Sequence, residues 1–420
     1  MKSHASIERS FSELEALSYL EKFVYDNFSK VKLIHDGEEL KTWFCSIEDC
    51  SGRTMSGMGK GIGDQCKISA ISEALEHYYY EYDISSVSTL KIRKSEEPEW
   101  YYDGSPNFEE ILSSHDKEVY LDHYRFSDYL THEPFYYPCF LGNPAYVPTT
   151  DAENELISLH CLHRYSCNSG VASGLNSQEA ILHGILELIE RDAIGIELIN
   201  TVISRNAKPV RVIERDSFPT ALNRLILDVE KSVGAQVEVY NITSDVNVPS
   251  ILASLVINKD GARFFGSGAS LSLEYAVERA VLESLQCVHG QRNLGYHYPI
   301  PEYTGLEEML PKYTKCYMDK GFFFHQGGKI SQSYNELLSD FSISNITNLS
   351  VSNQLDYLCN YLRSDLKMNV YERTLFSSSE KESDLGVWVK QVVIPKLERF
   401  YLVIGGHFVL PAKRGQRFLD

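Results

Sequence analysis

The sequence is short of basic residues. Its 420 residues include 58 aspartates and glutamates but only 40 lysines and arginines, and the formal net charge at pH 7 is −18. The basic residues are spread along the chain and form no basic stripe. A protein that binds nucleic acid needs such a stripe to release counterions from the phosphate backbone. Nucleic acid is therefore not expected as a partner.

Long apolar runs are also missing. The N-terminal stretch "MKSHASIERSFSELEALSYLEKFV" contains no contiguous apolar region of the secretory-signal type. No segment approaches the about 20 apolar residues that a membrane-spanning helix needs. The apolar content of 43% is ordinary for a globular protein. These features predict a cytoplasmic protein with a buried core and no membrane partner.

Paired cysteines are absent as well. The nine cysteines are scattered and form no Cys-x-x-Cys pair, which is typical of reduced thiols in a reducing compartment. The densest group, "HCLHRYSC" at 160–167, has neither the paired spacing nor the second half that a zinc site requires. We interpret this group as a strand or loop with buried thiols.

Periodicity predicts an N-terminal extension over 1–55 and one larger domain over 56–420. The extension should hold a helix at 11–28 and two strands joined by an Asp36-Gly37 turn. In the larger domain the glycine run "GMGKGIG" at 57–63 is expected to be a loop, and a helix follows over 64–81. The segment 332–354 is rich in serine and asparagine, which predicts a loop or an insertion.

The rest of the larger domain mixes helix and strand signals. Short strands and turns are expected between about 85 and 160. Further helices are predicted over 177–201, 272–289 and 354–364, and strands over 236–242, 250–258, 368–376 and 386–395. The order indicates the α/β (α+β) class.

Three of these helices share an unusual polar face. On a helical wheel at about 100° per residue, acids, hydroxyls, amides and arginine fall within one arc, opposite apolar side chains. The members of the arcs are Ser69, Glu73 and Glu76; Glu179, His183, Glu187, Glu190 and Arg191; and Arg279, Glu283 and Gln286. None of the arcs contains lysine, although solvated helix faces usually mix lysine with glutamate.

Two interpretations of these arcs remain open. Each helix taken alone fits an ordinary amphipathic helix whose acids face water. If the three arcs instead converge, their carboxylates raise one another's pKa, and a buried ionised group costs several kcal/mol unless a cation neutralises it. Oxygen ligands of this kind suit Mg²⁺, which also binds phosphate oxygens. Convergence would therefore predict a nucleotide site.

The glycine run could contribute to such a site through Lys60, which could reach phosphate oxygens. It is not a P-loop, because Gly61 follows the lysine where that motif needs serine or threonine. It also lacks the third glycine of the dinucleotide-binding fingerprint. Taken alone, the run fits a flexible turn equally well.

Three stretches, in this order, resemble the YcaO family. They are "GKGIGDQCKISAISEALEHY" from Gly59, "NSGVASGLNSQEAILHGILELIERDA" from Asn168 and "GSGASLSLEYAVERAVLESLQ" from Gly266. The resemblance covers about 60–300, and the strands near 368–395 fit the family's C-terminal part less specifically. It implies a YcaO-type domain of mixed or antiparallel sheets and packed helices around a nucleotide site, with ATP and Mg²⁺ as cofactors.

The resemblance also implies roles for individual residues. The metal ligands would be Glu73, Glu76, Glu179, Glu187, Glu190 and Glu283. The nucleotide contacts would be Lys60, Ser69, Glu73, Glu76, Arg191 and Gln286. One position departs from the family pattern: His77 stands where members often have arginine, which leaves one charged contact in doubt.

By resemblance, the enzyme would use ATP to activate a backbone amide in a peptide or protein. The product would be an azoline, a thioamide or an amidine, depending on the nucleophile. Azoline-forming members usually end in a PxPxP tail, whereas this sequence ends "HFVLPAKRGQRFLD". Thioamide formation with a TfuA-type partner is therefore expected about as strongly as azoline formation. An E1-like leader-binding partner would be a separate polypeptide.

Two further predictions concern an alternative function and the oligomeric state. A non-catalytic, nucleotide-binding docking subunit of a peptide-modifying complex is the alternative function. The tyrosine-rich stretch "EHYYYEYD" at 76–83 fits either a buried core or the surface of a homodimer.

Overall fold

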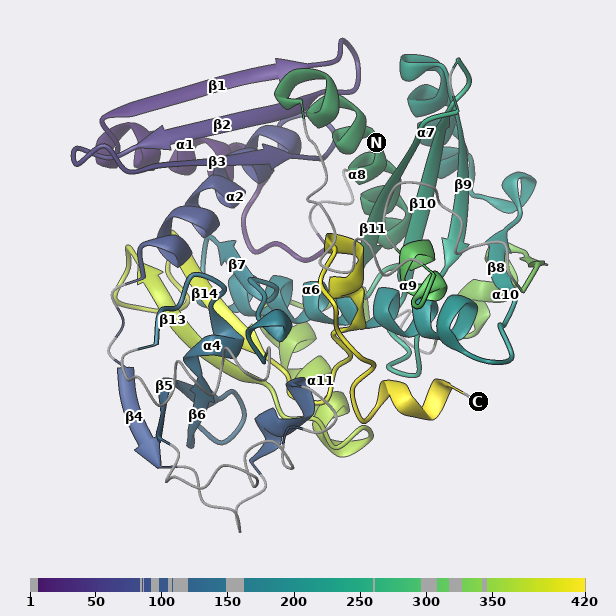
Figure 1. Ribbon diagram of the computed structural model, residues 1–420. Coiled ribbons are helices and arrows are strands. Elements are labelled where there is room, and N and C mark those ends of the chain that lie inside the picture. Colours follow the sequence, from purple (N-terminus) through teal and green to yellow (C-terminus); the bar gives the residue numbers. More distant parts are fainter. Residues whose placement is uncertain are drawn as a thin grey trace.

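The computed structural model contains three sheets with helices packed around them (Figure 1). It describes residues 7–83, 85, 87–91, 98–104, 108, 120–148, 162–259, 261–295, 308–316, 327–341 and 346–419. The mixture of helices with antiparallel and mixed sheets confirms the expected fold class. No helix within these ranges is long and apolar enough to cross a membrane.

The first sheet is antiparallel and has the strand order β1-β2-β3 (Lys30–Asp36, Thr42–Glu48, Thr54–Gly59). Helix α1 (Glu13–Asn27) begins at a capping box formed by Ser12 and Glu15. Helix α2 (Gln65–Glu81) lies along β3 and β2, and a shared apolar core joins it to α1. The expected N-terminal helix and strand pair are therefore confirmed.

The second sheet is six-stranded and antiparallel. Its order is β4-β5-β13-β14-β7, and β6 pairs with β5. The strands are β4 (Val87–Lys91), β5 (Tyr120–Asp128), β6 (Pro134–Pro138), β7 (Val171–Gly174), β13 (Tyr371–Ser377) and β14 (Trp388–Val393). The strands predicted at 368–376 and 386–395 correspond to β13 and β14, which lie next to each other.

The third sheet has the order β11-β10-β9-β8-β12, in which only the β8 and β12 pair is parallel. Its strands are β8 (Val210–Ile213), β9 (Ala235–Asn241), β10 (Ser250–Ile257), β11 (Arg263–Ala269) and β12 (Lys329–Gln332). Helices α7 (Thr220–Val233) and α8 (Leu273–Leu294) pack on this sheet and on each other. The strands predicted at 236–242 and 250–258 are thus confirmed as β9 and β10.

Helix α6 (Ser177–Leu198) lies between the two larger sheets, at the centre of Figure 1. It contacts β7 and β14 of one sheet, β11 of the other, and α11 (Val351–Ser364). Asn176 caps its N-terminus by accepting a hydrogen bond from the Glu179 N–H. Most of its residues are buried, including Glu179, Glu190 and Asp192. The chain continues beyond α6 in a π-helical turn, η4 (Ile199–Ile203).

The remaining described elements are short. They are α4 (Cys139–Gly142), α9 (Pro311–Cys316), α10 (Tyr334–Ser339) and the 3-10 turns η2 (Glu99–Asp103), η3 (Leu162–Tyr165), η5 (Arg215–Ser217), η7 (Ile346–Asn348), η8 (Phe400–Gly405) and η9 (Gly415–Phe418). Residues 160 and 161 of the "HCLHRYSC" group lie outside the described ranges, and Cys167 is buried.

The segment 332–354 differs from its prediction as a loop or insertion. Its described part contains α10, η7 and the first turn of α11. Ser333 and Glu336 form a capping box at the start of α10, and Ser350 caps α11. Two of the serines that suggested a loop, Ser333 and Ser350, are therefore helix caps. For Ser333, the Ser-x-x-Glu spacing was the available signal.

The glycine run also differs in part, because Gly57 and Gly59 belong to β3 rather than to a loop. A Cβ atom on Gly59 would lie 1.8 Å from the carbonyl oxygen of Cys66 in α2. Glycine is needed there because the strand and the helix approach so closely. Strand β3 also crosses the predicted boundary between residues 55 and 56, and the division into two domains stays a prediction.

Replacing Gly59 by alanine should lower the stability of the fold. The new methyl group would meet backbone atoms of α2, which cannot move aside alone, so we expect a loss of about 2 kcal/mol or more. Thermal unfolding measures the change. Gly405→Ala is the control, because its added Cβ would meet only side-chain atoms of His407, at 3.6 Å or more. Equal melting temperatures for the two variants would contradict the packing role of Gly59.

Candidate functional site

A cleft of about 720 Å³ lies where α2, α6 and α8 meet. Nearly all of the residues predicted for the site line it: Lys60, Ser69, Glu73, Glu76, Glu187, Glu190, Arg191, Glu283 and Gln286. The three polar arcs therefore converge. The alternative interpretation, in which the acids are exposed helix surface, is wrong for these residues.

The two glutamates of α2 are held by neighbouring strands. Glu73 accepts a hydrogen bond from the Met58 N–H of β3 at 2.9 Å. Glu76 accepts two bonds from Ser173 of β7, from the backbone N–H at 2.8 Å and from the hydroxyl at 3.0 Å. Burial raises the pKa of both carboxyl groups, and the charge of Glu73 adds to the rise at Glu76.

Helix α6 contributes two glutamates and an arginine. Glu190 accepts hydrogen bonds from the Ser267 hydroxyl at 2.6 Å and from the Ala269 N–H at 3.2 Å. Arg191 lies 3.7 Å from Glu187 and 3.6 Å from Glu190. Burial raises the pKa of Glu187 to about 7. Burial alone would also raise the pKa of Glu190, but the charges of Arg191, Lys60 and Arg279 lower it overall.

Helix α8 supplies the third side of the cleft. Glu283 forms an ion pair with Lys60 and accepts a hydrogen bond from the Ser267 N–H at 3.2 Å. Gln286 donates from its amide to the Met58 carbonyl at 2.7 Å. Lys60 and Gln286 therefore tie the glycine run to α8, although the two segments are more than 200 residues apart in sequence.

One pattern is common to the five glutamates of the convergent arcs: each accepts a hydrogen bond from a backbone N–H. The pairs are Glu73 with Met58, Glu76 with Ser173, Glu187 with Gly170 at 3.4 Å, Glu190 with Ala269, and Glu283 with Ser267. A carboxylate can accept about four hydrogen bonds. These backbone bonds therefore fix the orientation of the side chains and leave lone pairs for further ligands.

The charges that line the cleft do not balance. The lining residues include six glutamates against four lysines and arginines. The raised pKa values of Glu73, Glu76 and Glu187 express the cost of keeping this excess ionised away from water. A divalent cation with oxygen preference would remove that cost, so the donor set fits Mg²⁺.

The glutamates are spread around the cleft rather than gathered at one point. Among the described residues, no three histidine, cysteine, aspartate or glutamate side chains are close enough to hold a metal ion together. Mg²⁺ usually takes one or two carboxylates, several waters and the phosphates of its substrate. The arrangement therefore fits ions that bind together with a nucleotide better than a metal cage made of protein ligands alone.

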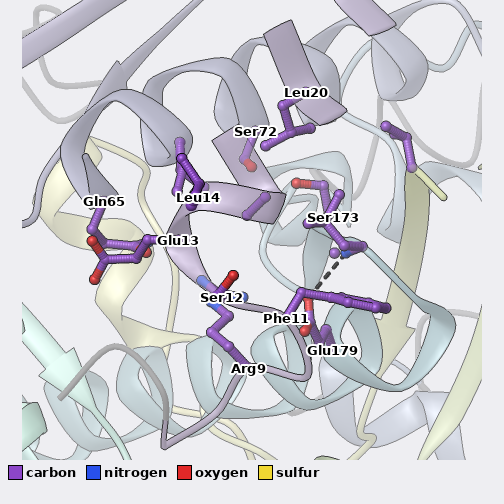
Figure 2. A pocket seen from close by; sticks show the side chains of 15 residues that line it. Arg9, Phe11, Ser12, Glu13, Leu14, Leu20, Gln65, Ser72, Ser173 and Glu179 are labelled. Atoms are coloured by element: carbon purple, nitrogen blue, oxygen red, sulfur yellow. Dashed lines mark hydrogen bonds between the residues drawn. The ribbon is translucent and has the colours of Figure 1, made fainter. Parts of the chain in front are cut away.

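Glu179 is the exception among the predicted residues. It lines a smaller neighbouring cavity of about 370 Å³, bordered on one side by Arg9, Phe11 and Ser12 of the N-terminal segment (Figure 2). Its carboxylate accepts hydrogen bonds from the Leu175 N–H at 3.0 Å and from the Ser10 N–H. Its place gives no support to a metal contact, and that role stays a prediction.

Two basic residues of the cleft were missed as site residues. Arg279 lies on α8, and its Nε atom is buried without a hydrogen-bond partner among the described residues. Its place in the polar arc, four residues before Glu283, was the available signal. Arg9 lines both cavities, and the sequence gives no signal for it because it precedes the first helix.

His77, the departure from the family pattern, also lines the cleft. Its Nδ1 atom lies 2.8 Å from the Ser56 carbonyl oxygen, and Nε2 lies 4.0 Å from Glu73. An imidazole thus stands beside the first glutamate of α2, where a longer arginine side chain would reach further into the cleft.

The raised pKa of Glu187 predicts how stability depends on pH in the absence of ligands. The group ionises near 4.5 in the unfolded chain and near 7 in the folded protein. Between these values the unfolded chain releases the proton first, so the free energy of unfolding falls as the pH rises. Above about pH 7 it remains reduced, by about 3 kcal/mol. Glu187→Gln should remove this loss. Urea denaturation at pH 5 and pH 8 tests it, and an equal pH dependence in both proteins would contradict the assignment.

Comparison with known protein families gives a match over most of the chain. A model described as "YcaO cyclodehydratase, ATP- and Mg²⁺-binding" matches residues 58–398. That description names the two cofactors that the sequence resemblance implied.

Two curated relatives are similar over shorter stretches. An uncharacterised protein of Methanothermobacter thermautotrophicus is 27% identical over 157 residues, which are 36% of this chain and 39% of that protein. A Rhizobium leguminosarum bv. trifolii protein, described as lying in the tfuA 3′ region, is 29% identical over 93 residues, 21% of this chain and 20% of its own length. The match therefore spans well under half of either relative.

Solved structures share the fold. The YcaO protein of Methanopyrus kandleri, bound with AMPPCP and Mg²⁺, superimposes with a TM-score of 0.63 and 18% identity over 96% of both chains. A heterocyclase in complex with substrate and cofactor gives a TM-score of 0.65 and 15% identity over 96% of this chain and 55% of the other. The E. coli microcin synthetase McbBCD complex gives 0.52 and 14% over 87% and 88%. Taken with the family match, the convergent cleft leads to one conclusion: this chain belongs to the YcaO family, whose members bind ATP and Mg²⁺.

Proposed function

We propose that this protein uses ATP and Mg²⁺ to activate a backbone amide of a peptide or protein by O-phosphorylation. The observation that carries this proposal is the convergence of acidic and basic residues from α2, α6 and α8 on one cleft. Its volume of about 720 Å³ is within the usual range for small-molecule sites, about 300 to 1,000 Å³.

The residues of the cleft divide into two groups by their chemistry. Lys60, Arg191 and Arg279 present positive charge for the phosphate oxygens of the nucleotide. The carboxylates of Glu73, Glu76, Glu187, Glu190 and Glu283 would hold Mg²⁺, with Ser69 and Gln286 as neutral hydrogen-bonding groups. Bound Mg²⁺ supplies the positive charge that neutralises phosphate oxygens during phosphoryl transfer.

The reaction requires positioning more than acid or base strength. A nucleophile adds to the amide carbonyl, the resulting oxygen attacks the γ-phosphorus of ATP with release of ADP, and phosphate then leaves from carbon. The backbone hydrogen bonds to the five glutamates hold these side chains in place before any ligand binds. Such preorganisation lowers the cost of reaching the transition state.

Two products fit this activation, and each has one supporting observation. The family description names a cyclodehydratase, which favours an azoline made from a cysteine, serine or threonine side chain of the substrate. The Rhizobium relative is described by its place in the tfuA 3′ region, which favours a thioamide made with a TfuA-like partner that delivers sulfur. An E1-like leader-binding protein would be the partner in the first case.

A non-catalytic docking subunit is the alternative function. It has support in the likeness to a chain of the microcin synthetase complex, which contains several different subunits. Such a subunit would bind nucleotide without turnover. The presence together of the acids and bases that line the cleft favours the enzyme instead.

Nucleotide binding should stabilise the protein through the acidic helices. At about a hundred times the dissociation constant, Mg²⁺-AMPPCP should add about 3 kcal/mol to the unfolding free energy. Glu190→Ala should abolish most of this gain, because it removes a carboxylate and leaves Arg191 partly unpaired. Differential scanning fluorimetry with and without Mg²⁺ measures the shift.

Glu214→Ala is the matched control, since that glutamate is exposed and lies outside the cleft. An unchanged shift in Glu190→Ala would show that the nucleotide binds elsewhere.

Oxygen transfer tests the chemistry. With a peptide whose backbone carbonyl carries ¹⁸O, ATP and the partner protein, we expect the label in inorganic phosphate. Mass spectrometry of the peptide then separates the products, because an azoline has lost one water and a thioamide has exchanged oxygen for sulfur. Unlabelled phosphate released with modified peptide would contradict O-phosphorylation. Nucleotide binding without any modified peptide would support the docking subunit.

A further inference from the structure

A second, smaller chamber opens beside the cleft. Its volume is about 180 Å³, and it shares Arg191, Glu283 and Cys287 with the cleft. Apart from the shared residues, its walls are mostly apolar: Ile194, Leu198, Ile242, Leu252, Phe265 and Ile404. A ligand bound near Arg191 and Glu283 would therefore have an apolar recess directly next to it.

One polar side chain in this chamber is unusual. Glu197 lines it and is 9% exposed. Within the described part of the chain, its carboxylate has no hydrogen-bond or ion-pair partner. The carboxylate oxygens of Glu197 are not among the fully buried atoms that lack a partner, so they keep contact with the space of the chamber. A group that enters the chamber can therefore donate a hydrogen bond to this carboxylate.

The position of Glu197 relates the chamber to the reaction. It follows Glu190 by seven residues on the same face of α6, which places it about 10 Å further along the helix axis. An extended peptide covers about 3.4 Å per residue. About 10 Å corresponds to about three extended residues, so a side chain within about three residues of the activated amide can reach the chamber.

We propose that the chamber receives an aromatic side chain that carries one hydrogen-bond donor, the phenol of a tyrosine or the indole of a tryptophan, from the peptide substrate. The proposal rests on the proposed function, since it names a substrate feature read next to the same cleft. The ring packs against the apolar walls, and its O–H or N–H group donates to the carboxylate of Glu197.

A neutral donor fits the chamber better than an ammonium group. Arg191 lines the entrance, and the charges of Arg211 and Lys208 act on Glu197 from nearby, so a lysine side chain would meet three positive charges. Burial raises the pKa of Glu197 to about 7, which also reduces the negative charge available to a cation. A purely apolar side chain would leave the carboxylate without a partner.

The test compares three probes with the protein saturated with Mg²⁺-AMPPCP: N-acetyl-tyrosinamide, N-acetyl-tryptophanamide and N-acetyl-phenylalaninamide. Titration followed by NMR gives the dissociation constants. We expect at least one donor-bearing probe to bind about tenfold more tightly than the phenylalanine probe, the usual contribution of a hydrogen bond to a charged group. Whichever of the two binds more tightly identifies the side chain.

Two variants place the binding in the chamber. Glu197→Leu should remove the advantage of the donor-bearing probe and leave phenylalanine binding equal or tighter. Ile404→Trp fills the chamber and should weaken all three probes, which keeps the test valid if the first variant folds poorly. Glu214→Gln, an exposed glutamate outside both cavities, is the control.

The proposal is overturned if the phenylalanine probe binds as tightly as both others, if none binds, or if the preference survives in Glu197→Leu. The thermal shift with Mg²⁺-AMPPCP, measured on the same samples, separates this failure from that of the proposed function. A normal shift without probe discrimination removes only the aromatic pocket. No shift in the native protein removes both.

Discussion

The main physical constraint on this structure is the free-energy cost of holding several carboxylates close together in a partly enclosed cleft. Six glutamates line it against four lysines and arginines, and burial raises the pKa of three of the glutamates. Each ionised group loses hydration energy there, and the bases compensate only in part. A bound divalent cation would offset the remaining cost, and the ions that accompany a nucleotide are cations of this kind. The protein without ligand is therefore less stable to unfolding than it would be with cations bound in the cleft.

Three similar units of strand and helix build this cleft. In each, a strand rich in small residues precedes a helix with an acidic face: β3 before α2, β7 before α6 and β11 before α8. Glycines allow the close approach, because a Cβ on Gly59 or Gly266 would collide with the backbone of the following helix. The strands then donate backbone N–H groups to the glutamates of their own or a neighbouring helix. The same close contacts between strands and helices therefore determine both how the helices pack and where the glutamates are held.

Much of the site could be predicted from the sequence. Helical periodicity places the acids on one face of each helix, and the three motifs follow one another in an order that resembles the YcaO family. The positions of Glu179 and Asp192 could not. Glu179 accepts a bond from Ser10, and Asp192 pairs with Arg414 near the other end of the chain. A helical wheel shows which residues share a face but not which distant segment covers it. Glu197 lies on the same helix, but only the packed structure shows that its carboxylate lines a chamber and has no hydrogen-bond partner among the described residues.

We infer that the acids of α2, α6 and α8 form one metal and nucleotide site. Crystals grown with Mn²⁺ and AMPPCP test this most directly, because the anomalous signal of manganese locates the ions without assumptions about ligands. We expect manganese peaks within coordination distance of carboxylates from the set Glu73, Glu76, Glu187, Glu190 and Glu283, with the nucleotide phosphates beside them. Manganese and nucleotide bound elsewhere on the protein, with these glutamates uncoordinated, would contradict it.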